Sequence, residues 1–154
     1  MEIRCKGGKF PCHKVILASC SNVFERMFSQ ENMVEGQRAF VIIQDAQPAT
    51  IKHMLEFIYT GKTSGLKQFA CELLAIADKY NLQILKAKCE KALIFQISVA
   101  NAIKIFTTAD LHGAPSVREF ASCFIKANIG QVCRSTDWLS FVISYPHLVE
   151  SLMK

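Results

Sequence analysis

Apolar residues recur at intervals of three and four positions over most of this chain, whereas short apolar runs near its start follow a different pattern. Residues 1–5 predict a strand that turns at Gly7-Gly8 into a return strand starting at Phe10, which makes a hairpin. Residues 39–43 are apolar and β-branched, which predicts a buried strand. The pattern therefore predicts a little sheet at the start of an otherwise helical chain.

A helical hairpin is predicted between these strands. Residues 15–18 predict one short helix and residues 23–28 a second, separated by the polar break at 19–21. After the strand at 39–43, Pro48 suits the first turn of a longer helix. Gly61 is placed to end that helix in the left-handed conformation.

The rest of the chain has a helical pattern to its end. Asn81 is expected to separate two helices, Ser98 to cap a third, and Pro115 to open a fourth. A final helical pair is expected around Trp138 and over residues 147–153, with a hinge at Tyr145-Pro146, because the residue before a proline disfavours the helical conformation. The predicted fold class is α+β, with short strands and helical hairpins followed by an all-α part.

Composition fits this picture. The 154 residues are 51% hydrophobic, which predicts one ordinary globular domain or one domain with a small appendage and excludes disorder. The seven cysteines are odd in number and contain no C-x-x-C pair, and the first ten residues lack the apolar run of a secretory signal. We therefore expect reduced cysteines that fill the core, in the nucleus or the cytoplasm.

Charge does not indicate a nucleic-acid or membrane partner. The 18 Lys and Arg exceed the 13 Asp and Glu by five, but they are spread singly and in pairs rather than as a basic stripe. The phenylalanines have the helical spacing of a core rather than that of a base-stacking platform. The longest apolar stretches fall far short of the about 18 residues that a membrane-spanning helix needs.

No motif predicts catalysis. Cys12 and His13 are adjacent, so on a helix their side chains would point about 100° apart and could not form a nucleophile pair. The remaining histidines lack metal-ligand spacing: His53, His112 and His147. The sequence T-G-K-T at 60–63 lacks the upstream glycine of a phosphate loop and is interpreted as a helix end. We expect no enzymatic activity, no cofactor and no bound metal.

One stretch of the sequence carries a family resemblance. Residues 10–28 read FPCHKVILASCSNVFERMF, which resembles the signature of the BTB (POZ) domain. Two further matches, FIYTG at 57–61 and LLAIADKY at 73–80, stand in that family's order and spacing. The resemblance implies a BTB/POZ fold over residues 1–95.

The second half resembles a narrower group. SVANA at 98–102, ADLH at 109–112, Trp138 and YPHLV at 145–149 are similar to the BACK-like helical extension of the speckle-type POZ proteins and their MATH-BTB relatives. This implies a helical extension over residues 96–154. Those relatives are cullin-3 ubiquitin ligase adaptors, whose substrate-binding MATH domain has no counterpart in this sequence. The alternative is a BTB scaffold that forms homodimers or heterodimers with other BTB proteins without a cullin.

The resemblance also implies site residues. The family contacts cullin-3 through a hydrophobic-x-Glu tripeptide, which matches Met33-Val34-Glu35 here, and the implied contact extends to Tyr80 and Leu82. Methionine offers an adaptable apolar plug, and a nearby glutamate can accept hydrogen bonds at the rim of an interface.

Ile16 and Leu17 match positions near the family's dimer interface. The sequence starts at the first strand, without the leading helix that covers this surface in the family, so self-association is expected to be weak. The sequence does not identify a substrate.

Overall fold

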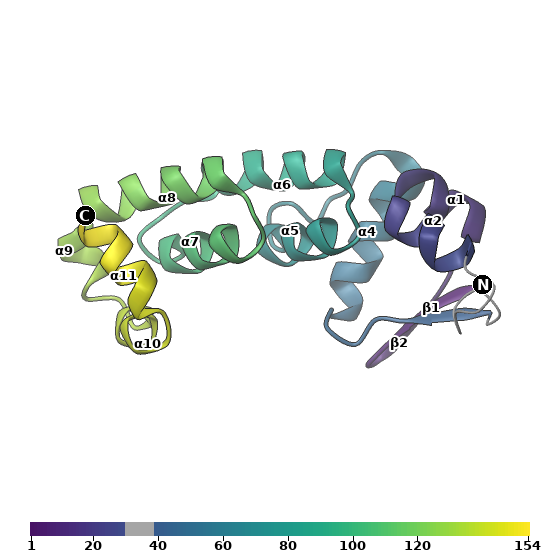
Figure 1. Ribbon diagram of the computed structural model, residues 1–154, viewed down its shortest axis with the longest axis horizontal. Coiled ribbons are helices and arrows are strands. Elements are labelled where there is room, and N and C mark those ends of the chain that lie inside the picture. The colour runs from purple at the N-terminus through teal and green to yellow at the C-terminus, as the bar shows by residue number, and fades with distance from the viewer. Residues whose placement is uncertain (30–38) are drawn as a thin grey trace. The chain divides into compact units, whose positions relative to one another are not determined.

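The computed structural model describes residues 1–29 and 39–154 (Figure 1). They divide into two compact units, Met1–Lys88 and Cys89–Lys154, which are treated separately here. The first unit contains a small sheet and a set of helices, and the second is entirely helical. Helix α6 (Gln83–Gln96) is continuous across the boundary.

The sheet has three short strands in the order β2-β1-β3. β1 (Glu2–Cys5) pairs antiparallel with β2 (Gly8–Pro11) and parallel with β3 (Phe40–Ile42). The predicted hairpin is present, but its turn is shifted by one residue and its return strand starts at Gly8, which pairs with Cys5, rather than at Phe10. Gly7 has φ 95°, a left-handed conformation that glycine adopts at little cost.

The predicted buried strand at 39–43 is only partly buried. Val41 and Ile43 lie in the core, whereas Ile42 is 52% exposed. β3 is an edge strand, and successive side chains of a strand point to opposite faces. Its alternate residue therefore faces solvent, although the run is apolar throughout.

The predicted helical hairpin is confirmed. Helices α1 (Lys14–Cys20) and α2 (Asn22–Ser29) are separated by Ser21, which is buried. The Ser21 hydroxyl oxygen accepts a hydrogen bond from the Phe24 N–H at 3.2 Å. Ser21 therefore satisfies one of the free N–H groups at the start of α2, as capping serines do.

Three other helix boundaries follow the expected local signals. α4 (Pro48–Thr60) starts at its proline and ends at Gly61, whose φ is 73°. The Gly61 N–H donates to the Phe57 carbonyl at 2.7 Å, which closes the last turn. Asn81, with φ 52°, separates α5 (Ala70–Lys79) from α6.

The centre of the second unit is a pair of helices, α7 and α8, which pack extensively against each other. Three shorter helices come after them in the chain. The bounds of these helices are α7 (Ala102–Leu111), α8 (Pro115–Ala127), α9 (Ile129–Val132), α10 (Asp137–Ser144) and α11 (Pro146–Met153). Phe106 and Phe141 meet edge to face in the core, with ring centroids 6.2 Å apart. Arg118 donates to Asp110 at 2.7 Å and to Ser151 at 3.2 Å, so one guanidinium connects α7, α8 and α11.

The start of α7 differs from the expectation for Ser98. The helix begins at Ala102 rather than directly after Ser98. The Ser98 carbonyl accepts the N–H groups of Asn101 and Ala102, at 3.2 and 2.9 Å, in the turn before the helix. The Ser98 N–H donates to the Asn101 side-chain oxygen at 2.7 Å, so Ser98 starts this turn and does not cap the helix.

Candidate interaction surface

The predicted tripeptide Met33-Val34-Glu35 lies outside the described residues, but both flanks of its segment are described. On one side α2 ends at Ser29. On the other side the Ala39 carbonyl accepts the Glu2 N–H at 2.9 Å, which places Ala39 beside β1. The segment is therefore attached at one end to α2 and at the other to the sheet.

Tyr80 and Leu82 are both buried, at 3% and 4% exposure. The Tyr80 ring stacks on Phe24 of α2, with centroids 4.5 Å apart and planes within 5°. Burial, with a smaller contribution from the Asp45 charge, raises the pKa of Tyr80 to about 12. Of the two side chains predicted to contact a partner, Tyr80 therefore packs against α2, and Leu82 is buried as well.

Polar contacts fix the same region. The Ser21 hydroxyl donates to the Tyr80 carbonyl, and the Asn81 side chain donates to the Asn22 side chain at 3.0 Å. These bonds attach the start of α2 to the turn between α5 and α6. Asn81 in this turn has a positive φ, a left-handed conformation that asparagine adopts more readily than most residues. Helix α2 is therefore anchored by both stacking and hydrogen bonds.

An exposed ion pair lies beside this anchor. Lys79 donates to both carboxylate oxygens of Asp45, at 2.8 and 2.7 Å. The hydrogen bond from Lys79 is the main reason that the pKa of Asp45 is lowered. Both side chains are about half exposed, so the pair contributes at most about 1 kcal/mol to stability.

The two residues predicted near a dimer surface, Ile16 and Leu17, differ in burial. Leu17 is fully buried, Ile16 is half-buried, and Val15 is 80% exposed. Ile16 and Val15 line an open, largely apolar groove of about 620 Å³. The remaining lining residues are Met1, Cys12, His13, Lys14 and Ala39. The sequence interpretation missed Val15, although a residue two positions from the buried Leu17 lies on the other side of a helix.

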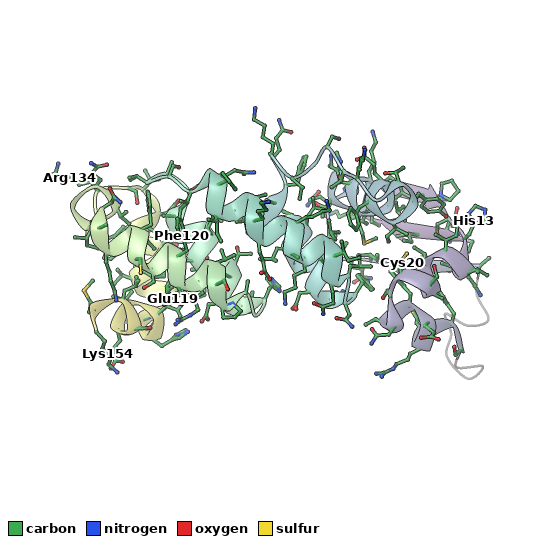
Figure 2. The ribbon with its side chains drawn as sticks, turned by 90° about the horizontal axis from the view of Figure 1, so that it is seen from above. His13, Cys20, Glu119, Phe120, Arg134 and Lys154 are labelled. Carbon is green, nitrogen blue, oxygen red and sulfur yellow. The ribbon has the colours of Figure 1, made fainter. Side chains whose placement is uncertain are left out.

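Helix α1 is held at its start by α4. The His13 N–H donates to the Tyr59 hydroxyl at 2.9 Å, and the His13 ring nitrogen Nδ1 lies 2.8 Å from the same oxygen. His13 and Cys20, at the two ends of α1, are both exposed (Figure 2). Cys12 is buried instead, and burial raises the pKa of its thiol. Cys12 and His13 both precede α1, so the helical separation of about 100° expected from the sequence does not apply to them; they differ in exposure instead.

A second apolar groove, of about 500 Å³, lies between the ends of α1 and α4 and the start of α6. Its lining includes Ser19, Cys20, Phe57, Ile58, Gly61 and the stretch from Asn81 to Leu85. Sequence reasoning did not identify it. The only sequence signal is Ile84, an apolar residue outside the buried stripe of α6.

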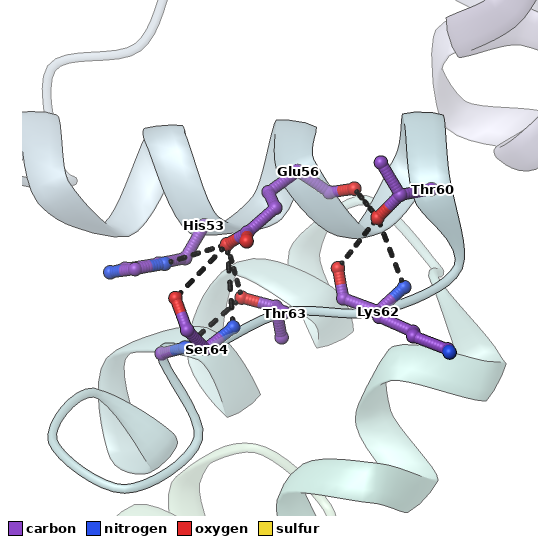
Figure 3. A network of polar contacts seen from close by, with 7 residues as sticks. His53, Glu56, Thr60, Lys62, Thr63 and Ser64 are labelled. Atoms are coloured by element: carbon purple, nitrogen blue, oxygen red, sulfur yellow. Dashed lines mark hydrogen bonds and ion pairs between the residues drawn. The ribbon is translucent and has the colours of Figure 1, made fainter.

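A polar cluster orders the loop after α4 (Figure 3). The Glu56 carboxylate lies 3.1 Å from His53 Nδ1 and accepts hydrogen bonds from Thr63 at 3.1 Å and from the Ser64 N–H at 3.4 Å. The contact with His53 is the main reason that the pKa of Glu56 is lowered. All its contacts are made within one helix and the following loop, which indicates a loop-ordering role. The sequence at 60–63 is thus the end of a helix, as expected.

Within the two described stretches, no three His, Cys, Asp or Glu side chains are grouped as a metal site would need. Across the same residues, the helices are all too short or too polar to cross a bilayer.

Two named proteins are similar to this chain over most of its length. It is 41% identical over 145 residues to "TD and POZ domain-containing protein 1" of Mus musculus, covering 93% of this chain and 40% of that protein. It is 42% identical over 145 residues to "TD and POZ domain-containing protein 4" of Mus musculus, covering 93% of this chain and 39% of that protein. The chain thus spans about two fifths of the length of these relatives.

A solved structure gives the same fold. The chain superimposes on the BTB domain of zebrafish PATZ1 with a TM-score of 0.52 and 25% identity, over 60% of this chain and 72% of that one. This confirms the predicted BTB fold with its small sheet, helices and helical extension. The BTB/POZ domain family matches residues 1–97. BTB domains are protein-interaction domains, generally without enzymatic activity, and this chain belongs to the BTB/POZ domain family.

Proposed function

We propose that this chain is a cullin-3 adaptor module of a ubiquitin ligase, which binds the cullin through the segment after α2 and through a BACK-like extension over residues 96–154. Membership of the BTB/POZ family supports a protein-interaction function. The resemblance of the second half to the speckle-type POZ proteins supports cullin-3 as the partner. The observation that carries the proposal is the anchoring of α2 by Tyr80.

Anchoring matters because a short recognition segment loses less conformational freedom on binding when its supports are already fixed. Phe24 stacks on Tyr80, and Asn22 bonds to Asn81, so α2 is held along its first half. Met33, Val34 and Glu35 follow α2 within a few residues. Tyr80 and Leu82 contribute to the proposed surface from beneath it rather than by direct contact.

The tripeptide residues have distinct proposed roles. Met33 fills an apolar groove of the cullin, which its flexible side chain can fit closely. Glu35 accepts hydrogen bonds at the edge of the contact, where water remains. Val34 spaces the two side chains. This division predicts that Met33 contributes more binding energy than Glu35.

The test is a titration of the whole chain with the purified amino-terminal domain of cullin-3. Met33→Ala is expected to cost roughly 2 kcal/mol or more, about thirtyfold in affinity, because it removes a buried anchor. Glu35→Ala is expected to cost about 1 kcal/mol or less, because an exposed polar contact contributes little. Calorimetry measures both, and circular dichroism checks that each variant is folded.

A control uses two exposed side chains that lie outside both proposed contact regions. Lys52 of α4 and Lys67 of the following loop are both exposed, so the double variant Lys52→Ala, Lys67→Ala removes side chains from another surface. The control is expected to retain wild-type affinity. Unchanged binding by a folded Met33→Ala, Glu35→Ala variant would refute the tripeptide as the cullin contact.

The second candidate function is a BTB scaffold that acts by self-association or by pairing with other BTB proteins. The groove lined by Val15 and Ile16 favours it, because an open apolar groove of about 620 Å³ offers area for a second chain. Val15→Asp places a charge in that groove, so it should shift a concentration-dependent dimer toward monomer in analytical ultracentrifugation. A dimer that withstands this change, in a chain that does not bind cullin-3, would argue for a scaffold that uses another surface.

A further inference from the structure

Four side chains form a stripe along one face of α6: Ile84, Lys88, Lys91 and Phe95. Successive positions differ by four, three and four residues, so at about 100° per residue all four lie within about 60° of one another. All four are exposed, and the two apolar ends are 70% and 81% exposed. The stripe is therefore apolar at both ends and basic in the middle.

The opposite face of the same helix is buried. Leu85, Cys89 and Leu93 are fully or almost fully buried, and they hold α6 against the protein. Lys86, on the side of this buried face, donates to Asp78 at 2.9 Å. Lys88 and Lys91 form no ion pair with any residue in the described stretches. The two lysines of the stripe thus keep their charge available to a partner.

We propose that this stripe, the α6 stripe, binds an acidic amphipathic helix of another protein. A complementary helix carries apolar side chains at i and i+11 and acidic side chains at i+4 and i+7. Its anchors would be about 16 Å apart, the same distance that separates Ile84 from Phe95 along α6. This goes beyond the proposed cullin contact, because it uses different residues.

Charge complementarity decides between an acidic helix and a second copy of this chain. In an antiparallel pair of α6 stripes, Ile84 would meet Phe95 of the other copy, and Lys88 would meet its Lys91. Two pairs of like charges would then face each other, which is unfavourable. A parallel pair also brings lysines together. Acidic side chains at the same positions convert this repulsion into attraction.

A bilayer fits the stripe less well. Helices that lie in a membrane interface bury a broad, continuous apolar face. Here lysines separate the two apolar residues, and the neighbouring exposed position on this side is Ala87. A lipid surface would therefore gain little apolar contact.

The test uses the whole chain and a fluorescein-labelled helical probe of about 16 residues, with Leu, Glu, Glu and Leu at i, i+4, i+7 and i+11. Fluorescence anisotropy measures its affinity. Lys88→Glu with Lys91→Glu is expected to weaken binding about tenfold or more, because attraction becomes repulsion. A probe with Lys in place of both Glu should bind this double variant more tightly than it binds the wild-type chain.

The matched control reverses two exposed lysines elsewhere. Lys52→Glu with Lys126→Glu changes the net charge equally, on α4 and α8, and should leave the affinity within about twofold. Phe95→Ser should weaken the probe without changing the charge. Circular dichroism shows that each variant is folded.

Several results would overturn the proposal. One is equal affinity of the wild-type chain and the Lys88→Glu, Lys91→Glu variant for the probe. Another is equal affinity for a proline-containing probe of the same composition that cannot form a helix. Tighter binding to phosphatidylserine vesicles or to duplex DNA than to the probe, lost in the same double variant, would assign the stripe to those ligands instead. Loss of a dimer in the double variant would assign it to a second copy.

Discussion

Tyr80 shows how one residue, through its ring and its backbone, joins distant parts of the first unit. Its ring lies on Phe24, its carbonyl accepts the Ser21 hydroxyl, and Lys79 lies 5.5 Å from its ring centroid. Stacking of two buried aromatic rings adds about 0.5–1.5 kcal/mol to the free energy gained from burial alone. The residue thus determines where α2 sits, although the sequence resemblance implied a contact with a partner.

The raised pKa of Tyr80 predicts a loss of stability at alkaline pH. The phenol ionises near 10 in the unfolded chain and at about 12 in the folded one, so between these values the unfolded state loses its proton first. The free energy of unfolding should therefore fall by roughly 2–3 kcal/mol from pH 10 to pH 12 on account of this group. Urea denaturation at a series of pH values measures the fall.

Two variants separate Tyr80 from other alkaline effects. Tyr80→Phe keeps the ring and removes the hydroxyl, so its stability should fall less over the same pH range. Tyr145→Phe removes the hydroxyl of a tyrosine that is exposed, and should retain the wild-type pH dependence. An equal fall in the wild-type chain and in Tyr80→Phe would contradict the assignment.

At the scale of elements, two features order the loop between α4 and α5: the Glu56 carboxylate, and the close contact of the Gly65 backbone with the His53 ring. Glu56 binds His53, Thr63 and Ser64, and the backbone at Gly65 passes directly over the His53 ring. A Cβ at position 65 would lie 2.5 Å from His53 Cγ and 2.9 Å from its Cβ. Glycine is thus required here by a lack of space.

Gly65→Ala should destabilise the chain by about 1–3 kcal/mol, because an atom close to the α4 backbone cannot move aside easily. Gly130→Ala is the control: it lies in α9, and an added Cβ meets nothing within 4 Å. The control should change stability by less than about 1 kcal/mol and should tend to stabilise the helix. Thermal denaturation compares the two. Equal melting temperatures of Gly65→Ala and the wild-type chain would show that His53 can move without cost.

Element boundaries show which features the sequence can predict. Pro48, Gly61 and Asn81 mark boundaries correctly because each acts through its own backbone preferences. Ile42 and Ser98 were misjudged because edge position and turn geometry depend on neighbours distant in the chain or on the path of the backbone. The family signature at 10–28 identified the BTB fold, whereas the groove between α1, α4 and α6 is marked in the sequence by Ile84 alone.

The cysteines illustrate the arrangement of the whole molecule. None of the seven forms a disulfide bond, and they are distributed over both compact units. Cys12, Cys71 and Cys89 are buried, Cys5 is half-buried, and the others are exposed: Cys20, Cys123 and Cys133. The expectation that cysteines fill the core therefore holds for some of them only.

This distribution predicts the reactivity of the native chain toward a thiol reagent such as Ellman's reagent. The three exposed cysteines should react rapidly and Cys5 more slowly, whereas the three buried ones should react only after unfolding, because thiol reactivity requires access. Absorbance over time counts the thiols, and urea releases the remainder. Immediate reaction of all seven would contradict the burial of Cys12, Cys71 and Cys89.

The parallel pairing of β1 with β3 has a consequence for the order in which the chain acquires its structure. β1 and β2 are joined by a two-residue turn and can meet as soon as both are synthesised. Ile3 meets Val41 only after a loop of more than thirty residues has closed, which costs entropy that local contacts do not repay. On the ribosome, the outer edge of β1 therefore stays unpaired until β3 emerges, and during that interval its backbone N–H and C=O groups are open to pairing with another strand.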